Sequence, residues 1–327
     1  MYSVCLNNSN ACKKDNIVTL FKNSNMNEYF GEKCECCKSD KINIVYKDSF
    51  FGLPVLKCNN CFLHFIPISS KKDLKKYYTD NYWTDFRIRN KSIAEEVGDE
   101  HESNKFLKII TKAIDLIGVR KSLVLSQYYY LKSFIKGNSL LEIGAGEGLA
   151  LEFFEQKDFK VFGIEPSPKN VILINKKLKK GKCLIGFAED LSIFNTKFDI
   201  IIMSHILEHT INCRDIILNI SKSLSSDGIL FIEVPNCENE KLVKQSINEP
   251  HVYHFTKKSL YSLVISLGYQ VIKIDTFSTL HLSSKLNYFK YLWYWILKRD
   301  CYYPSSSEVG EILRIIIKNP NIKQIKC

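Results

Sequence analysis

Two pairs of cysteines near the start of the chain have the spacing of metal ligands. Cys34 and Cys37 form one C-x2-C pair, and Cys58 and Cys61 form a second pair after twenty intervening residues. Each C-x2-C turn points two sulfurs at one centre, and two turns complete the tetrahedron of a structural Zn²⁺ site. We therefore predict a zinc-ribbon-like module over residues 31–70 with these four ligands, and Cys36 offers an alternative pairing with Cys34.

A glycine-rich turn between two apolar segments has the residue types that hold a nucleotide. The apolar segment 139–143 is followed by Gly144, Gly146 and Gly148, and an amphipathic helix opens at Leu149. A second apolar segment then ends at Glu165. Glycines let the backbone approach a ligand closely. A strand, turn, helix, strand and terminal acid make a nucleotide-binding βαβ unit, in which the carboxylate can accept hydrogen bonds from both ribose hydroxyls.

The spacing G-x-G-x-G, preceded by Glu142, resembles motif I of the class I S-adenosylmethionine (SAM)-dependent methyltransferases. Further motifs of that family follow in order along the chain. They are Ala188-Glu189-Asp190, the apolar segment 198–203, His205-Ile-Leu-Glu208-His209, the segment 228–236 and the segment 251–272. The resemblance implies an α/β fold with a doubly wound, Rossmann-like, seven-stranded sheet, and SAM as the methyl donor.

The resemblance also implies which residues contact SAM. The predicted cofactor-binding residues are Glu142, Gly144, Ala145, Gly146, Gly148, Glu165, Ala188, Glu189, Ser204 and His205. One position departs from the pattern, because Phe187 stands where the subgroup described next commonly has an aspartate that contacts adenine. Adenine contact is therefore expected from the backbone of Ala188 and from Glu189.

The cysteine pairs, with Tyr77, Tyr78 and Tyr82, extend the resemblance to a subgroup that carries an N-terminal zinc-binding module and includes sugar C-methyltransferases. This resemblance implies a small-molecule acceptor, such as a nucleotide sugar or glycan precursor, and His251 as the catalytic base. Pro250 stands where the subgroup has a glutamate, so O- and N-methylation fit the sequence as well as C-methylation.

Methyl transfer is an in-line displacement, so a base is required only when the acceptor must lose a proton. His254 and Glu233 are weaker catalytic candidates than His251, for which packing or capping a loop is the alternative role. His205 and His209 are four residues apart, but Glu208 between them lacks the spacing of an H-E-x-x-H metal motif. We therefore expect His205 to line the cofactor pocket and His209 to be structural.

Charge does not favour a nucleic-acid partner. The 327-residue chain has a formal net charge of +11, yet only six of its 46 cationic side chains are arginines, the residue that phosphate and base recognition favours. Residues 138–275 carry 16 basic and 17 acidic side chains. Two alternatives to a small-molecule methyltransferase stay open: an RNA or protein methyltransferase that grips its polymer through the ribbon, and an inactive cofactor-binding module.

The predicted organisation has five segments. A variable segment (1–30) precedes the ribbon (31–70), a helical bridge (71–137) follows it, and the methyltransferase domain (138–284) leads into a C-terminal helical tail (285–327). Within these we expect a basic and then aromatic helix from residue 71, helices near 102–117 and 119–135, a final strand at 279–283, and helices at 287–298 and 307–318.

The sequence also indicates where the protein works. No apolar stretch is long enough to span a bilayer, and residues 1–21 lack the apolar core of a signal peptide. We therefore expect a cytoplasmic protein, whose cysteines stay reduced and available to a metal.

Overall fold

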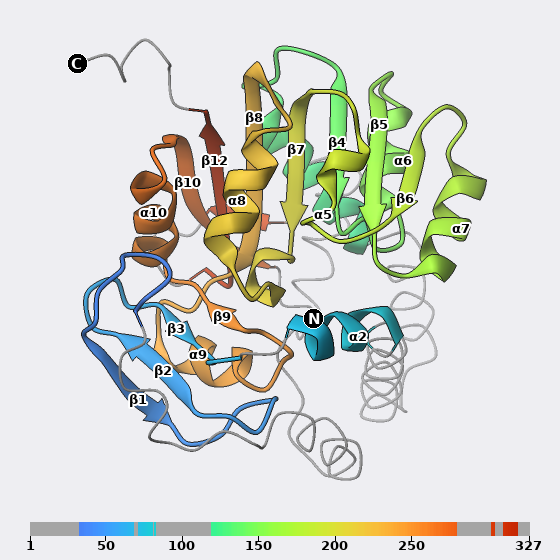
Figure 1. Ribbon diagram of the computed structural model, residues 1–327. Helices are drawn as coiled ribbons and strands as arrows, with labels where there is room; N and C mark the ends of the chain where they lie inside the picture. The colour runs from blue at the N-terminus through green and yellow to red at the C-terminus, as the bar shows by residue number, and fades with distance from the viewer. Residues whose placement is uncertain are drawn as a thin grey trace, which may run out of the picture.

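The computed structural model describes residues 33–68, 71–80, 82, 119–279, 302–304 and 310–319. Figure 1 shows two sheets, a large one at the top and a small one at the lower left. The large sheet has eight strands in the order β11-β10-β12-β8-β7-β4-β5-β6. Their bounds are β4 Ser139–Ile143, β5 Lys160–Glu165, β6 Lys182–Ile185, β7 Phe198–Ser204, β8 Leu224–Pro235, β10 Gln270–Thr279, β11 Tyr302–Pro304 and β12 Ile312–Lys318.

The central strands of the large sheet are parallel. Strand β4 pairs with β5 on one side and β7 on the other, and β6 and β8 extend the parallel part. Strands β12, β10 and β11 follow in antiparallel pairing. The predicted doubly wound, Rossmann-like α/β fold is confirmed, and the short strand β11 makes the sheet one strand wider than the predicted seven.

The C-terminal part of the chain corrects one prediction. Residues 307–318 were expected to form a helix, but Ile312–Lys318 is the strand β12, inserted between β10 and β8. Its sequence ILRIIIK is buried except at its last residue, and a run this rich in isoleucine suits a strand covered on both faces. Thr279, where the final strand was expected to begin, is the last described residue of β10 (Gln270–Thr279).

Several other expected elements lie outside the described residues. They are the helices near 102–117 and 287–298, together with residues 280–283 of the expected final strand. The helix expected at 119–135 is present as α5, Val119–Leu131.

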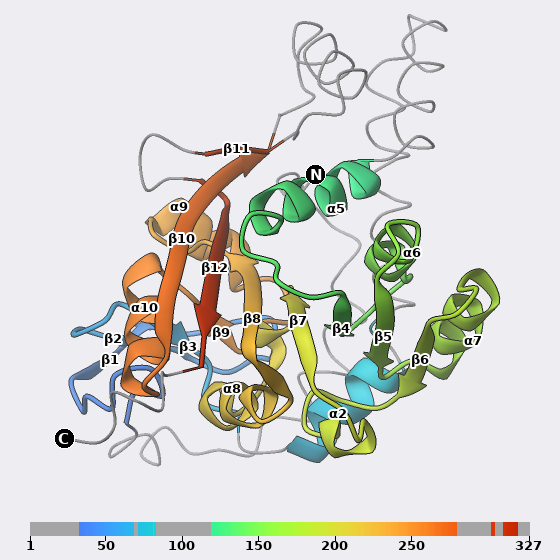
Figure 2. The same ribbon diagram turned by 90° about the horizontal axis from the view of Figure 1, so that it is seen from above.

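Helices cover both faces of the large sheet, and Figure 2 shows them on its two sides. On one face, α5, α6 and α7 enclose a core that includes Leu131, Phe154 and Ile174. On the other face, α8 and α10 enclose a second core that continues into the small sheet. The bounds of the remaining helices are α6 Leu149–Glu155, α7 Pro168–Lys177, α8 Cys213–Ser221, α9 Glu240–Ser246 and α10 Lys257–Ser266, with short 3-10 turns η2 Leu191–Ile193 and η3 Leu207–His209.

The small sheet contains strands from two distant parts of the chain. Strands β1 (Ile42–Tyr46), β2 (Val55–Cys58) and β3 (His64–Phe65) belong to the cysteine-rich segment. The fourth strand, β9 (Tyr253–His254), comes from the segment after α9 and pairs with β3. We call strands β1–β3 and their turns the ribbon. A strand from the segment after α9 therefore completes the sheet of the ribbon.

Helix α2 (Lys71–Asp80) lies below the arrowheads of β7 and β5 in Figure 1. Its buried side chains are Leu74 and Tyr77, and the Tyr77 ring centroid lies 6.0 Å from that of Phe50 in the ribbon. The aromatic side of the helix thus packs against neighbouring parts of the fold.

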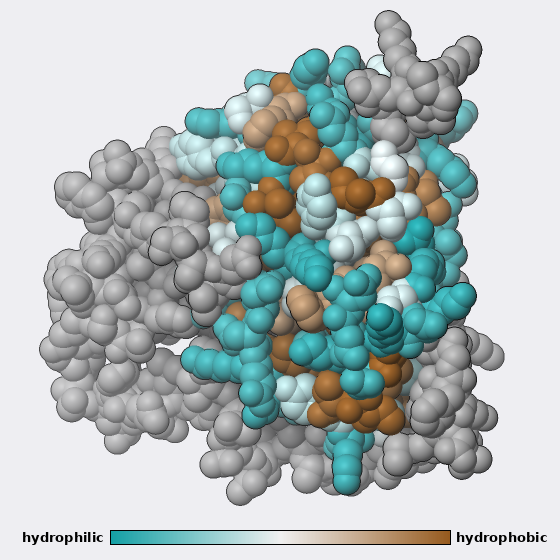
Figure 3. All heavy atoms as spheres, turned by 90° about the vertical axis from the view of Figure 1, so that its left-hand side faces the viewer, coloured by the Kyte–Doolittle hydropathy of each residue, from teal (hydrophilic) through white to brown (hydrophobic). Residues whose placement is uncertain are grey.

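The side of the molecule that faces left in Figure 1 has a mixed surface. In Figure 3 its brown, apolar side chains form patches that teal, polar side chains separate. Exposed apolar residues of α10 and the ribbon include Ile44, Phe62 and Ile265. Among the described residues, no helix combines the length and apolar character that crossing a bilayer requires.

Candidate active site and metal centre

The predicted cofactor loop lies at the carboxyl end of β4, between β5 and β7. Gly144, Gly146 and Gly148 all have left-handed backbone angles, with φ of 70°, 57° and 76°, which glycine adopts without strain. A Cβ at Gly144 would lie 2.0 Å from Cδ1 of Ile206. Strand order reverses at this position, because β5 lies on one side of β4 and β7 on the other, and such switch points bind ligands in open α/β sheets.

Glu165 holds the glycine loop in place through hydrogen bonds to the backbone. Its carboxylate accepts hydrogen bonds from the backbone N–H of Gly146 and of Ser167, both at 3.0 Å. The side chain is buried at the carboxyl end of β5. These two bonds connect the glycine loop to the start of α7, so the carboxylate lies where the ribose contact was predicted.

Glu142, on β4 before the loop, is a buried carboxyl with an unusual environment. Burial, together with the negative charge of Glu165, raises its pKa to about 8. Its Oε2 atom has no hydrogen-bond partner among the described residues. Glu142 is therefore largely protonated at neutral pH and can donate a hydrogen bond.

Helix α2 contacts the predicted adenine-binding segment. Lys75 Nζ lies 3.6 Å from Glu189 Oε1 and 4.6 Å from the ring centroid of Phe187, while Ala188 is buried between them in sequence. The bridge segment thus covers the loop after β6, where the sequence placed the adenine contacts.

Ser204 and Glu233 belong to a buried polar network at the carboxyl ends of β7 and β8. Ser204 Oγ donates to Glu233 Oε1 at 2.8 Å, and Gln127 Nε2 donates to both side chains at 3.0 and 2.9 Å. Arg314 Nε donates to Glu233 Oε2 at 2.6 Å. Burial alone would raise the pKa of Glu233, but the charges of Arg314 and His205 and the hydrogen bonds from Ser204 and Arg314 together lower it. Glu233 is thus an ionised partner of Arg314, which suits a positioning role.

His205 follows β7 in a strained backbone conformation, with φ of 54°, which is uncommon for a residue other than glycine and often marks a functional site. Its Nδ1 lies 3.2 Å from Glu208 Oε1 and its Nε2 lies 3.5 Å from Glu233 Oε1. Burial lowers its pKa, but the hydrogen bond and charge of Glu208 outweigh burial and raise it.

His251 lies in a cluster of aromatic and imidazole rings next to this network. Its ring centroid is 4.8 Å from that of His209, and one ligand atom from each of Glu208, His209 and His251 lies within 4.8 Å of the others. Tyr78 Oη donates to the Pro250 carbonyl at 2.7 Å and lies 2.7 Å from His209 Nδ1. The tyrosine side of α2 therefore meets the candidate base.

His209 is oriented by a backbone carbonyl. Its Nδ1 lies 2.9 Å from the oxygen of Pro250, and a carbonyl oxygen only accepts, so His209 carries a proton on Nδ1. This bond holds η3 against the segment that carries His251. The backbone N–H of Val252 donates to the Glu208 carbonyl at 2.7 Å and reinforces the same contact.

His254, the second histidine candidate, lies at the ribbon interface, opposite His64 of β3. It lies on β9, and its Nδ1 is 2.7 Å from Ser246 Oγ. Burial, with a smaller effect of His64, lowers its pKa to about 3. His254 is therefore neutral at physiological pH.

The four predicted metal ligands meet at one point in the ribbon. The Sγ atoms of Cys34 and Cys61 lie 3.5 Å apart, as do those of Cys37 and Cys58, and all four lie within 4.8 Å of one another. In a tetrahedral ZnS₄ centre with Zn–S bonds of about 2.3 Å, the sulfurs lie about 3.8 Å apart. The donor set and geometry fit Zn²⁺. Cys36 is not one of these four; it is buried beside them, with its thiol in contact with Cys34 and Cys61.

The structure also reveals site residues that the sequence did not single out. These are Gln127 and Arg314 in the network around Glu233, and Ser246, which lies between His251 and His254. A lone arginine inside the run ILRIIIK was the available signal for Arg314. Gln127 and Ser246 carry no sequence signal of their own, because their roles depend on contacts with residues far along the chain or on another element.

Curated relatives match the central part of the chain. A ubiquinone biosynthesis O-methyltransferase from Pelagibacter ubique is 33% identical over 105 residues, which cover 31% of this chain and 44% of the relative. The same-named protein from Azorhizobium caulinodans is 23% identical over 106 residues, which cover 31% of this chain and 42% of the relative. The chain therefore spans less than half the length of these relatives.

Solved structures of methyltransferases align over a larger part of the chain. A possible histamine N-methyltransferase from Thermotoga maritima aligns with a TM-score of 0.46 and 18% identity over 61% of this chain and 89% of that chain. The plantazolicin methyltransferase BpumL in complex with SAH aligns with a TM-score of 0.45 and 17% identity over 72% of this chain and 98% of that chain. The sequence itself matches the family described as "Methyltransferase domain" over residues 121–274. Residues 121–274 thus match a methyltransferase domain, in agreement with the resemblance that the motifs of the sequence indicate.

Proposed function

We propose that this protein transfers the methyl group of SAM to a small-molecule acceptor and that His251 removes the acceptor's proton. The observation that carries this proposal is the arrangement at the carboxyl edge of the large sheet. The glycine loop with Glu165 lies at the ends of β4 and β5, while His205 and Glu208 connect the end of β7 to the ring cluster of His251.

The cofactor residues fit SAM. The positive φ angles at Gly144, Gly146 and Gly148 keep the backbone free of side chains beside the ligand. Glu165 can accept from the ribose hydroxyls, and Glu142 can donate to a polar group of the cofactor. When bound, SAM supplies an electrophilic methyl group on a sulfonium, so the protein's main task is to place the acceptor in line with it.

A group of aromatic and histidine rings is proposed to hold the acceptor and to remove its proton. The ring centroids of Tyr78, Tyr82 and His209 lie 5.2 to 5.7 Å apart in tilted or edge contacts. The His251 ring makes a further tilted contact with His209, with 4.8 Å between the centroids. This wall suits a small ring-containing acceptor with a hydroxyl group. His251 takes the hydroxyl proton as the oxygen attacks, because a neutral imidazole is a suitable base near pH 7.

Two considerations favour oxygen as the methylated atom. The curated relatives are named as O-methyltransferases, and Pro250 replaces the glutamate that accompanies the base in the sugar C-methyltransferase subgroup. A nucleotide sugar or glycan precursor therefore stays within the proposal as a hydroxyl-bearing acceptor. We assign Zn²⁺, held by the four cysteine thiolates, a structural role, because four protein ligands leave no open position.

Transfer of a labelled methyl group tests this proposal. The purified protein is incubated with methyl-labelled SAM and a panel of nucleotide sugars and phenolic hydroxyl compounds, and labelled product is counted. We expect transfer to at least one acceptor, and His251→Gln should reduce its rate by about 100-fold or more while SAM affinity is kept. Asp227→Asn, which changes an exposed residue near the start of β8, is the control that should leave the rate unchanged. An unchanged rate in H251Q would remove His251 from the mechanism.

A further inference from the structure

Ser246 joins the two candidate histidines. Its Oγ lies 2.9 Å from Nδ1 of His251 and 2.7 Å from Nδ1 of His254. All three side chains are at least nine-tenths buried. Ser246 is the last residue of α9, so the helix places this hydroxyl between the ring cluster of the candidate active site and the strand that joins the ribbon.

A serine hydroxyl that lies between two ring nitrogens makes their protonation states depend on each other. The hydroxyl has one proton, so it donates to one Nδ1 and accepts from the other. If His251 carries its proton on Nδ1, Ser246 must donate to His254, whose proton is then on Nε2. In the reverse arrangement His251 carries its proton on Nε2. This nitrogen then has no free lone pair, so it cannot accept the acceptor's proton.

The other nitrogen of His254 faces the ribbon. His254 lies directly opposite His64 in the β3–β9 pair, and directly opposed residues have Cβ atoms about 4.5–5.5 Å apart on the same side of the sheet. His254 Nε2 and His64 Nδ1 are both buried and have no hydrogen-bond partner among the described residues. Two such nitrogens are an unusual feature, because buried polar atoms are nearly always paired.

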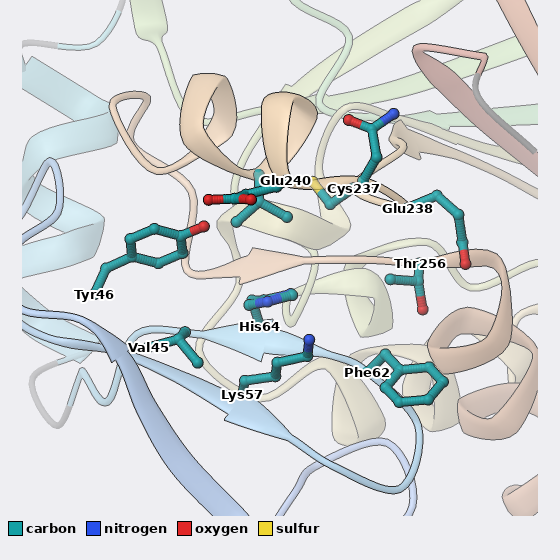
Figure 4. Close-up of a pocket in the computed structure, with 11 residues that line it drawn as sticks. Val45, Tyr46, Lys57, Phe62, His64, Cys237, Glu238, Glu240 and Thr256 are labelled. Carbon is teal, nitrogen blue, oxygen red and sulfur yellow. The ribbon is translucent and has the colours of Figure 1, made fainter.

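His64 borders a pocket on the outer side of this interface. The pocket has a volume of about 410 Å³ and lies between the ribbon and the segment that follows β8. Figure 4 shows His64 pointing from its ribbon strand toward the segment with Cys237 and Glu240, with Lys57 beside it on the neighbouring ribbon strand. Thus His64 reaches solvent-accessible space while its Nδ1 stays buried.

The groups around Ser246 do not compete for its proton. Burial raises the pKa of Cys237 to about 12, so this thiol, which is hydrogen-bonded to Ser246, stays protonated. Burial, with the positive charge of Lys57, lowers the pKa of His64 to about 4. His64 and His254 are therefore both neutral and can each hold one proton on either ring nitrogen.

We propose that Ser246, His254 and His64 form a proton-transfer path from His251 to the pocket at the ribbon interface. This inference rests on the proposed role of His251 as a base. The acceptor's proton binds to His251 Nε2, the Nδ1 proton moves to Ser246 Oγ, and the serine proton moves to His254 Nδ1. The Nε2 proton of His254 passes through a bridging water molecule to His64 Nδ1, and the Nε2 proton of His64 leaves into the pocket. One proton enters, one leaves, and every ring stays neutral.

Histidine ring protonation can be read directly by NMR on ¹⁵N-histidine-labelled protein, without any acceptor. In the wild type we expect the proton of His251 on Nδ1 and that of His254 on Nε2. His64→Phe removes the acceptor for His254 Nε2, so His254 should move its proton to Nδ1 and, through Ser246, His251 should move its proton to Nε2. His64→Gln keeps an acceptor oxygen and should retain the wild-type arrangement.

The double variant H64F/S246A shows whether the effect of H64F on His251 passes through Ser246 or comes from a general disturbance of the structure. In a Ser246→Ala background, His64→Phe should no longer change the ring protonation of His251. If the His251 signals are the same in wild type and H64F, or if the change persists without Ser246, the path is wrong. If H64F does not fold, S246A alone is informative: a changed His251 tautomer supports the path and an unchanged one overturns it.

The turnover assay provides the second measurement. With an acceptor from the methyl-transfer screen, H64F and S246A should lower kcat by about tenfold or more, with the KM for SAM unchanged. A wild type that fails to bind SAM would contradict the proposed function but leave the NMR result interpretable. An unchanged kcat in both variants, with the coupled tautomers present, would overturn only the proton path.

Discussion

Arg314 donates a 2.6 Å hydrogen bond through Nε to Oε2 of Glu233, and both side chains are completely buried. The two residues face each other in the β12–β8 pair, so the C-terminal strand supports the network at the carboxyl end of β7. Arg314 also donates through Nη1 to Ser126 Oγ at 2.7 Å. The last strand of the sheet is thus connected to the candidate cofactor site.

Replacing Arg314 with methionine should destabilise the protein. The change leaves Glu233 as a buried charge without its cation, which costs about 3–5 kcal/mol of the free energy of unfolding. The double variant R314M/E233Q should recover part of this loss, because no uncompensated charge remains. Denaturant unfolding of the two variants and of wild type measures the difference, and equal stability of R314M and wild type would show that the pair is not needed.

The metal prediction concerns the four cysteines of the ribbon. Cys58→Ser should abolish zinc binding and lower the thermal midpoint, because structural zinc contributes directly to folding. Cys183→Ser, which changes a buried cysteine on β6, should keep about one zinc per chain. Metal analysis of the purified variants checks this, and a wild type without zinc would refute the assignment.

Acid should destabilise the ribbon interface. The pKa values of His254 and His64, about 3 and about 4, lie below the value of about 6.5 in an unfolded chain. The unfolded state therefore binds more protons between these values, and stability falls as the pH decreases from about 6.5. Each histidine should lower the free energy of unfolding by about 2 kcal/mol between pH 7 and pH 5. In H64F the loss should be smaller, and identical pH profiles of variant and wild type would contradict this.

Glu142 should make the stability of the protein fall as the pH rises, which is opposite to the effect of the two histidines. Its folded pKa of about 8 is above the unfolded value, so its contribution to stability is complete below about pH 4 and is lost as the pH rises toward 8. Glu142→Gln should therefore be more stable than wild type at pH 8, by about 1 kcal/mol or more, and show little difference at pH 4. Denaturant unfolding of E142Q and wild type at pH 4 and pH 8 measures this difference. Equal stability of the two proteins at pH 8 would exclude a buried neutral carboxyl at Glu142.

Local motifs were predictable from the sequence because their chemistry depends on short spacing. The glycine turn between Ser139 and Glu165 specifies its own strand–turn–helix–strand geometry. Likewise, two C-x2-C turns can form a cluster only by approaching each other, and their Sγ atoms do so. These features need no knowledge of distant contacts.

Long-range pairing was not predictable in the same way. A run such as ILRIIIK fits a buried helix or a buried strand by periodicity alone, and only the open edge of β8 decides that it is a strand. The pairing of His64 with His254 depends on how the ribbon packs on the segment after α9. In the sequence His254 was therefore only a weaker candidate than His251, while the structure shows that Ser246 Oγ contacts Nδ1 of both rings.

Calorimetric titration with SAM and with S-adenosylhomocysteine tests the central claim most directly. We expect saturable binding of both ligands at one site per chain. Glu165→Gln should weaken the affinity about tenfold or more, because a charge-assisted hydrogen bond contributes about 1.5–3 kcal/mol, while Asp227→Asn should bind as wild type does. Absence of binding heat with both ligands, or equal affinity in E165Q and wild type, would contradict the proposed SAM site at the glycine loop and Glu165.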